Sequence, residues 1–232
     1  MLTGSNHNDW HSGPDRLLKN CCGRLRVLPG VVPAILLALM MSGCATERPR
    51  PAPLVCSGDQ HYFPVGTFPA AYPASDVQRR RWYSSYLARL HEPSLSCGKG
   101  PEETYRLTWL HTVAHPVVIR ITRRDGLVEA DAFQLSGSGG GDPGLVLYQT
   151  HKRLSMMEWE LLRVKLRDST FWSLPTSGNM YGVHGEQWIL EGRRNDTYHI
   201  VDRWTPPAGP YRDLGAFIFD LVGWRRPDSS GY

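Results

Sequence analysis

The chain has 232 residues and a formal net charge of +4 at pH 7. This length leaves room for one domain with a sizeable hydrophobic core, whereas two domains would be cramped. Part of the small charge comes from basic residues near the N-terminus, so it does not indicate binding to nucleic acid. The basic run at residues 79–81 is accordingly interpreted as the solvated face of a helix.

The N-terminal region, residues 1–43, is predicted to be a lipoprotein-type signal peptide. Its apolar run at residues 31–41 is too short to cross a membrane, because a transmembrane helix needs about 20 residues. A positively charged flank precedes the run, as in secretory signals, and consists of Arg16, Lys19, Arg24 and Arg26. The alternative interpretation is an ordinary signal anchor or a buried helix.

Cys44 closes a run that reads Leu-Met-Met-Ser-Gly-Cys. This run resembles the lipobox of bacterial lipoproteins, in which the cysteine is lipidated and becomes the first residue of the mature protein. Met41 stands where lipoboxes usually carry leucine. The resemblance implies a protein anchored in the bacterial cell envelope through acyl chains, palmitate among them, on Cys44. Ala45, where an aspartate would favour the inner membrane, implies the outer membrane facing the periplasm in a Gram-negative host.

Residues 44–74 are predicted to be a proline-rich tether followed by an irregular lead-in. Residues 45–53 read ATERPRPAP, a composition typical of an extended, semi-rigid spacer. Cys56 and Cys97 are the only cysteines after Cys44, and an exported protein would bring this pair into an oxidising compartment. We therefore predict a disulfide between them, worth ~4 kcal/mol in the chain-entropy model; two unpaired thiols are the alternative.

The first half of the domain is predicted to contain a helix and then strands. The helix begins at Ser75, where Gln78 can complete a capping box, and it ends before Pro93. Alternating apolar and polar residues predict strands at residues 105–109, 117–124, 127–135 and 145–151. Asp125 and Gly126 form a favoured two-residue hairpin turn, so the strands on either side of them should pair.

Residues 136–144 are rich in glycine and serine and connect two of these strands. The segment lacks the Gly-Lys-Ser/Thr ending of a phosphate-binding loop, and a strand rather than a helix follows it. We predict a flexible connection. A loop that gates a ligand is the functional alternative.

The second half of the domain is predicted to contain two helices and a further hairpin. Ser155 and Glu158 form a capping box at the start of a helix that ends near Trp172. Two strands follow, at residues 186–193 and 197–204. Pro210 suits the first turn of a last helix, whose apolar stripe extends to Val222.

This order of elements predicts the α+β class, with a single domain over residues 75–224 and a polar tail at 225–232. Hairpins dominate, and no strand–helix–strand alternation persists. We therefore expect a mainly antiparallel sheet of about six strands with helices packed on one face.

Residues able to carry acid–base chemistry occur in the predicted C-terminal hairpin. A histidine paired with a carboxylate is the usual arrangement for such work, and the weak candidates are His184, Glu186, His199 and Asp202. His111 and His115 have a spacing used for zinc on helices, but four residues along a strand separate two side chains by ~13 Å. No metal site and no cofactor are predicted.

Aromatic residues are concentrated in the C-terminal half of the chain. They are Trp159, Phe171, Trp172, Trp188, Tyr198 and Trp204. Packing in the core is the default interpretation. An exposed subset could stack on a sugar ring or anchor a protein partner.

Several short motifs together are similar to those of a family of uncharacterised bacterial proteins, many with lipoprotein-type leaders. These motifs are Arg81–Ser85, Glu92–Leu95, Tyr105–Trp109, His115–Arg120, Phe171–Pro175, Gly185–Gly192, Tyr198–Pro206 and Gly209–Gly215. The resemblance extends from about residue 80 to residue 222. It implies one intact domain, and it implies neither an activity nor catalytic residues.

Three functions are compatible with these observations. The leading hypothesis is a lipid-anchored envelope lipoprotein whose domain is a non-catalytic binding or structural module, with an envelope protein or a glycan as partner and no nucleic acid. The second is a periplasmic hydrolase-type enzyme that uses the histidines and carboxylates of the C-terminal hairpin. The third is an inhibitor or immunity-type module that docks through residues 136–144.

Overall fold

The computed structural model describes residues 62–68, 73–97, 100–178, 182 and 184–225. These residues belong to one compact unit, Pro51–Tyr232. The signal peptide, Cys44, the ATERPRPAP segment, Cys56 and most of the polar tail lie outside the described residues. Within the described part of the chain, no helix combines the length and the apolar character needed to cross a membrane.

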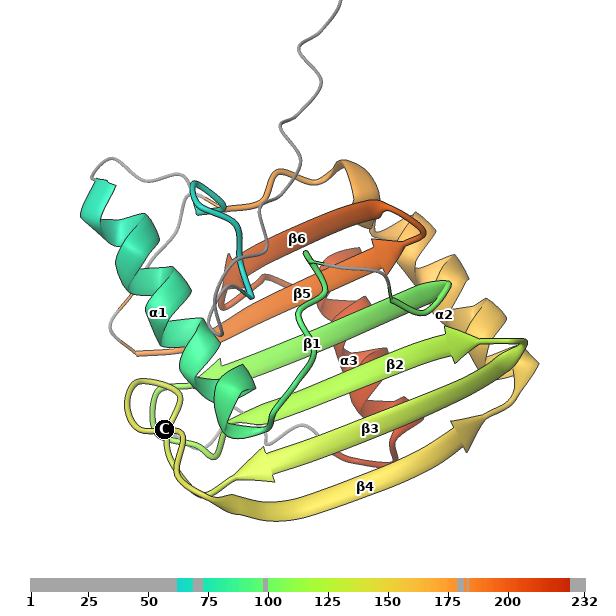
Figure 1. Ribbon diagram of the computed structural model, residues 1–232, viewed down its shortest axis with the longest axis horizontal. Helices are drawn as coiled ribbons and strands as arrows, with labels where there is room; N and C mark the ends of the chain where they lie inside the picture. The colour runs from blue at the N-terminus through green and yellow to red at the C-terminus, as the bar shows by residue number, and fades with distance from the viewer. Residues whose placement is uncertain (1–61, 69–72, 98–99, 179–181, 183, 226–232) are drawn as a thin grey trace, which may run out of the picture. The chain divides into compact units, whose positions relative to one another are not determined.

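A six-stranded antiparallel sheet forms the centre of the domain, with strand order β4-β3-β2-β1-β5-β6 (Figure 1). The strands are β1 Glu103–His111, β2 Val117–Arg124, β3 Leu127–Leu135, β4 Val146–Leu154, β5 Glu186–Arg194 and β6 Thr197–Trp204. Asp125 and Gly126 both have positive φ, which suits the tight turn between β2 and β3. The predicted α+β class and antiparallel sheet are confirmed.

Within the described residues, three α-helices and one short 3₁₀ helix pack on this sheet. They are α1 Pro73–Arg89, α2 Met156–Asp168, η1 Phe171–Ser173 and α3 Pro210–Leu221. The predicted capping box is present at α2: the Glu158 amide donates to Ser155 Oγ (3.2 Å), and the Ser155 amide donates to Glu158 Oε2 (2.7 Å). The chain leaves α2 at Asp168 rather than near Trp172, and η1 carries it back towards the sheet.

The helices do not share one face of the sheet, so this expectation is wrong. Figure 1 shows α1 on one side and α2 and α3 on the other. Tyr105, Leu107 and Trp109 of β1 belong to the hydrophobic cluster of α2 and α3, whereas Leu110 belongs to the cluster of α1. The strand residues that face α1 include both apolar and polar side chains. In the sequence alone, such a mixed pattern is typical of a sheet face that is exposed to solvent.

The larger hydrophobic cluster lies between the sheet and the helices α2 and α3. Its largest buried side chains are Trp109, Trp159 and Trp188. Gly215 lets α3 approach the sheet closely, because a Cβ at this position would lie 2.1 Å from Cζ3 of Trp188. This close packing holds α3 on the sheet and leaves α2 and η1 to cover the ends of β1 and β5.

The smaller cluster joins α1 and the preceding segment 62–68 to the opposite face. The rings of Phe63, Phe68 and Tyr83 contact one another edge to face, with centroids 5.2–6.2 Å apart. Asp76 of α1 accepts hydrogen bonds from the amides of Gly66 and Phe68, both at 3.0 Å. The end of the lead-in is thus packed on the domain.

Candidate functional site

The two carboxylates among the catalytic candidates lie on opposite faces of the sheet. Glu186 points towards α3, accepts a hydrogen bond from Trp109 Nε1 (2.8 Å) and lies 3.7 Å from an Arg212 guanidinium nitrogen. Asp202 points towards α1 and accepts hydrogen bonds from Tyr83 Oη (3.1 Å) and from the side-chain Nε2 of Gln187. Burial raises the pKa of Asp202 to about 6, against the opposing effects of these partners.

The two histidine candidates are also separated from each other. His199 lies opposite Gly192 in the sheet and packs against Phe171 and Trp172, with ring centroids 5.1 and 6.0 Å away. Burial lowers the pKa of His199. His184 is exposed and precedes β5.

The structure therefore does not assemble the four candidates into one site. Glu186 and His199 share a face, but Glu186 is six positions along β5 from the residue opposite His199, a separation of ~20 Å. Asp202 points to the other face. The geometry gives no support to a hydrolase that combines these side chains.

The two histidines with the zinc-like spacing, His111 and His115, have local roles in turns. Nδ1 of His111 accepts hydrogen bonds from the amides of Val113 (3.3 Å) and Ala114 (3.2 Å), and the ring stacks on Trp109. Nδ1 of His115 lies 3.2 Å from the Gly137 carbonyl oxygen. Among the described residues, no group of three or more His, Cys, Asp or Glu side chains could hold a metal ion.

The glycine-rich segment 136–144 is held against α1 by hydrogen bonds. Trp82 Nε1 donates to the Gly139 carbonyl (2.9 Å), and Tyr86 Oη donates to the Ser138 carbonyl (2.6 Å). A Cβ at Gly139 would lie 2.4 Å from the His111 carbonyl oxygen, so glycine is needed there for close packing. These contacts favour a structural turn over the expected flexible connection.

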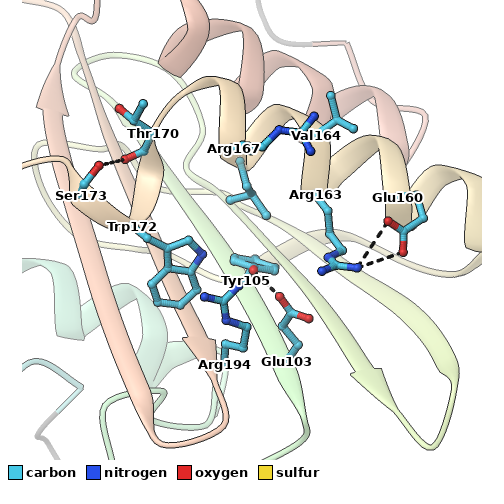
Figure 2. Close-up of a pocket in the computed structure, with 11 residues that line it drawn as sticks. Glu103, Tyr105, Glu160, Arg163, Val164, Arg167, Thr170, Trp172, Ser173 and Arg194 are labelled. Atoms are coloured by element: carbon cyan, nitrogen blue, oxygen red, sulfur yellow. Dashed lines mark hydrogen bonds and ion pairs between the residues drawn. The ribbon is translucent and has the colours of Figure 1, made fainter.

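A cavity of about 490 Å³ opens between α2, η1 and the ends of β1 and β5 (Figure 2). We call it the arginine pocket. Its less polar wall includes Tyr105, Val164, Leu166 and Trp172. Its charged and hydroxyl side chains are Glu103, Glu160, Arg163, Arg167, Thr170, Ser173 and Arg194. None of the four catalytic candidates lines it.

Tyr105 and Glu103 form a fixed pair within the pocket. The Tyr105 hydroxyl donates to Glu103 Oε1 at 2.5 Å, and both residues are buried. Burial, followed by the hydrogen bond to Glu103 and the charge of Glu103, raises the pKa of Tyr105. Tyr105 thus stays protonated at physiological pH and keeps its hydroxyl on the carboxylate.

Trp172 is held by aromatic neighbours and carries a cation on its ring. Phe171 and Tyr105 contact it edge to face at centroid distances of 5.2 and 6.2 Å. Cζ of Arg194 lies 4.9 Å from the ring centroid of Trp172, a cation–π contact. Arg194 is exposed at the end of β5 and forms no ion pair with any described residue.

The arginines of α2 that line the pocket have only exposed counter-charges. Arg163 contacts Glu160 at 3.2 Å, and Arg167 lies 3.8 Å from Asp168. Exposed ion pairs of this kind contribute about 0–1 kcal/mol to the stability of the fold. A ligand carboxylate can therefore replace the glutamate or aspartate beside each arginine with little loss of stability. Figure 2 shows the Arg163 and Arg194 side chains entering the pocket from different elements.

One feature of the sequence points to this site, although it is not part of any of the motifs discussed above. Arg163 and Arg167 are four residues apart, which places them on the same face of a helix. Arg194 belongs to a hairpin thirty or so residues later in the chain, and only the pairing of β5 with β1 brings it to the same place. Among the residues that line the pocket, Trp172 is the one that belongs to the aromatic set considered above as possible ligand contacts.

Comparisons with known proteins add no assignment. No protein-family model and no curated protein matches this chain. The arginine pocket and the motif at Cys44 are therefore the features on which a functional interpretation depends.

Proposed function

We propose that this protein is a lipid-anchored lipoprotein of the bacterial cell envelope and that its α+β domain is a binding module. The anchor is supported by the lipobox-like run that ends at Cys44 and by the proline-rich segment that follows it. The binding role rests on the arginine pocket, which Arg163 and Arg194 enter from different elements and in which Arg194 lies over the ring of Trp172. A glycan that carries carboxylate groups fits this chemistry.

The arginines explain why the ligand should be an anion. A guanidinium group presents a planar fork of donors that matches a carboxylate with two parallel hydrogen bonds. Arg194 has no carboxylate partner among the described residues, and the partner of Arg163 is exposed. An incoming carboxylate can therefore bind both without breaking a buried ion pair.

The wall of the pocket explains why a sugar should carry that carboxylate. The indole ring of Trp172 and the side chains of Val164 and Leu166 provide apolar surface for the faces of a sugar ring. The hydroxyls of Thr170 and Ser173 line the same cavity. In the envelope, peptidoglycan fragments combine sugar rings with free carboxylates, which makes them the appropriate probe.

Calorimetric titration of the full chain in detergent with soluble peptidoglycan fragments tests the pocket. We expect Arg194→Ala and Arg163→Ala each to weaken binding about tenfold, because a hydrogen bond to a charged group contributes about 1.5–3 kcal/mol. Arg124→Ala, which removes an exposed arginine at the end of β2, is the matched control and should bind like wild type. Fragments with amidated carboxylates should bind poorly. Equal affinity of all variants would contradict the proposal.

Labelling with a radioactive fatty acid tests the anchor independently of the pocket. Cys44→Ala should abolish the label and shift the protein from the membrane fraction to the soluble fraction. Cys44→Ser is the conservative companion and should behave in the same way. Continued labelling of either variant would exclude Cys44 as the attachment site.

The predicted disulfide is part of this proposal, and the surroundings of Cys97 support it. Ser96 Oγ donates to the Tyr62 carbonyl (3.0 Å), and a short segment of sequence separates Tyr62 from Cys56. Arg193 Nη1 donates to the Cys97 carbonyl at 3.2 Å, which positions this segment beside β5. Mass mapping under non-reducing conditions should find a peptide that joins Cys56 and Cys97. Recovery of both as free thiols would exclude the bond.

A further inference from the structure

The two edges of the sheet differ in whether the chain itself covers them. At β6, the Asp202 amide donates to the Thr176 carbonyl (2.6 Å), and the Gly178 amide donates to the Asp202 carbonyl (3.3 Å). Ser177 thereby forms a parallel bridge with Asp202. At the other edge, β4 pairs only with β3 among the residues that the structure describes. The backbone groups on the outer side of β4 are open to a further strand.

This open edge also has an unusual apolar surface. Leu145, Val146, Leu147 and Tyr148 are 67%, 44%, 43% and 65% exposed. Edge strands normally avoid such runs through charges, prolines or bulges, because an exposed apolar edge pairs readily with another chain. The first half of β4 carries no charged residue or proline, and its one irregularity, a register shift against β3 at Leu147, leaves these side chains exposed. We take this exposure as a sign that a partner covers the edge.

A second cavity lies beside this edge. It has a volume of about 400 Å³, and Tyr148, Thr150, Phe219 and Trp224 are among the residues that line it. It lies on the α3 side of the sheet, where Lys152 of β4 also donates to the Leu221 carbonyl (2.7 Å). Recognition by strand addition uses this combination: backbone hydrogen bonds provide affinity, and pockets for alternate side chains provide specificity.

We propose that β4 is a docking site for an extended segment of a partner protein, which adds as a seventh, antiparallel strand. The charges of β4 indicate the chemistry of that segment. Its charged residues are both basic: Lys152 is already ion-paired with Glu158 (3.0 Å), Arg153 is exposed, and the exposed Arg225 lines the neighbouring cavity. Arg153 forms no ion pair with a described residue. The partner segment therefore carries acidic residues opposite Arg153, followed by apolar residues opposite Val146–Tyr148.

A second copy of this chain fits the edge less well. Full-length antiparallel pairing of two β4 strands centred on Thr150 would place Leu147 opposite Arg153 and Tyr148 opposite Lys152. Apolar side chains would then face cations. A register that matches the apolar halves would leave the basic halves of both strands unpaired. The inference is independent of the arginine pocket, which lies at the other end of α2.

Fluorescence anisotropy with a labelled, end-blocked peptide tests this site on the full chain in detergent. The probe is Glu-Glu-Thr-Val-Thr-Val-Thr-Val, and its control is the same peptide with two lysines in place of the glutamates. We expect the acidic peptide to bind at least tenfold more tightly than the basic one, and to protect the amides of residues 146–153 from hydrogen exchange. Equal binding of both peptides, or protection elsewhere, would overturn the proposal.

Two variants extend the test. Leu147→Lys places a charge on the edge and should weaken binding at least tenfold; Tyr148→Thr, a milder change with high strand propensity, should also weaken it. Arg153→Glu should reverse the preference between the two peptides, whereas Arg124→Glu should leave it unchanged. If sedimentation shows a dimer that Leu147→Lys dissociates, a second copy occupies the edge, and the proposed partner segment is wrong.

Discussion

Two sets of arginines lie on opposite faces of the sheet, and they differ in how completely they are paired. Arg106, on the α1 face, is fully buried and forms two hydrogen bonds with Glu191 (2.7 and 2.8 Å) and one with the Pro93 carbonyl (2.6 Å). On the α2 face, Arg163 pairs only with the exposed Glu160, and Arg194 forms no ion pair with a described residue. The buried arginine on the α1 face stabilises the fold, whereas the exposed arginines on the α2 face remain available to bind a ligand.

The paired charges on the α1 face extend across five strands. Glu92, just after α1, contacts Arg106 (3.4 Å) and Arg120 (2.8 Å). From there, Arg120 reaches Asp131 of β3 (2.7 Å), and Asp131 reaches His151 of β4 (2.8 Å). The network therefore fixes the exit of α1 on the sheet, and the Arg106–Glu191 pair at its centre is fully buried.

The largest effect should follow from breaking this network at its buried centre. Glu191→Ala would leave Arg106 buried without its main counter-charge, which we expect to reduce the free energy of unfolding by about 3–5 kcal/mol. Removing both charges with Arg106→Met and Glu191→Leu should restore most of that loss. Urea unfolding of the three proteins measures it. A single variant as stable as wild type would contradict the structural role of the pair.

The pH dependence of stability should show a smaller effect from the same face. Because burial raises the pKa of Asp202 to about 6, the folded state holds its proton more tightly than the unfolded state, in which the pKa is near 3.8. The contribution of Asp202 to the free energy of unfolding is therefore fully present below about pH 4 and is lost as the pH rises through 6. The loss should approach about 3 kcal/mol, at 1.36 kcal/mol per pKa unit.

Comparison with Asp202→Asn isolates this contribution. The variant keeps an oxygen and a nitrogen near Tyr83 and Gln187, but it cannot titrate. Urea unfolding at pH 4.5 and pH 7 should show a larger decline for wild type than for the variant. Identical declines would show that Asp202 does not titrate in this range.

The smallest effect on stability should come from the loosely paired arginines. Arg163→Ala and Arg194→Ala should each change the free energy of unfolding by less than about 0.5 kcal/mol, because exposed charges contribute little. Thermal unfolding measures this directly. A loss as large as that of Glu191→Ala would mean that the pocket arginines also serve the fold, and the contrast between the two faces would disappear.

The periodicity of the sequence was sufficient to predict the sheet but not the covering of its two faces. Alternation in β1–β6 and the turn at Asp125-Gly126 predicted the strands and their antiparallel pairing. Helices on one face were expected because hairpins dominate the order of elements, and that order does not reveal whether the second face, with charges such as Arg106 and Glu191, is solvated or covered. Only the structure shows that these charges pair with one another under α1.

The candidate site was missed for a related reason. Glu186 and Asp202 are close in a hairpin diagram, yet their registers in β5 and β6 send them to opposite faces. The residues that do converge are Arg163, Trp172 and Arg194, which come from a helix, a 3₁₀ turn and a strand end. Each is unremarkable in the sequence, because their proximity depends on how α2 packs across the end of the sheet.

The central claim is that an anionic glycan binds in the arginine pocket, and an NMR titration tests it most directly. The indole N–H signal of Trp172, assigned by its loss in Trp172→Phe, and the Nε–H signals of Arg163 and Arg194 would be followed as peptidoglycan fragments are added to the full chain in detergent. We predict that these signals shift together and saturate at one ligand per protein, and that amidated fragments leave them unchanged. Unchanged signals at saturating fragment would contradict the claim.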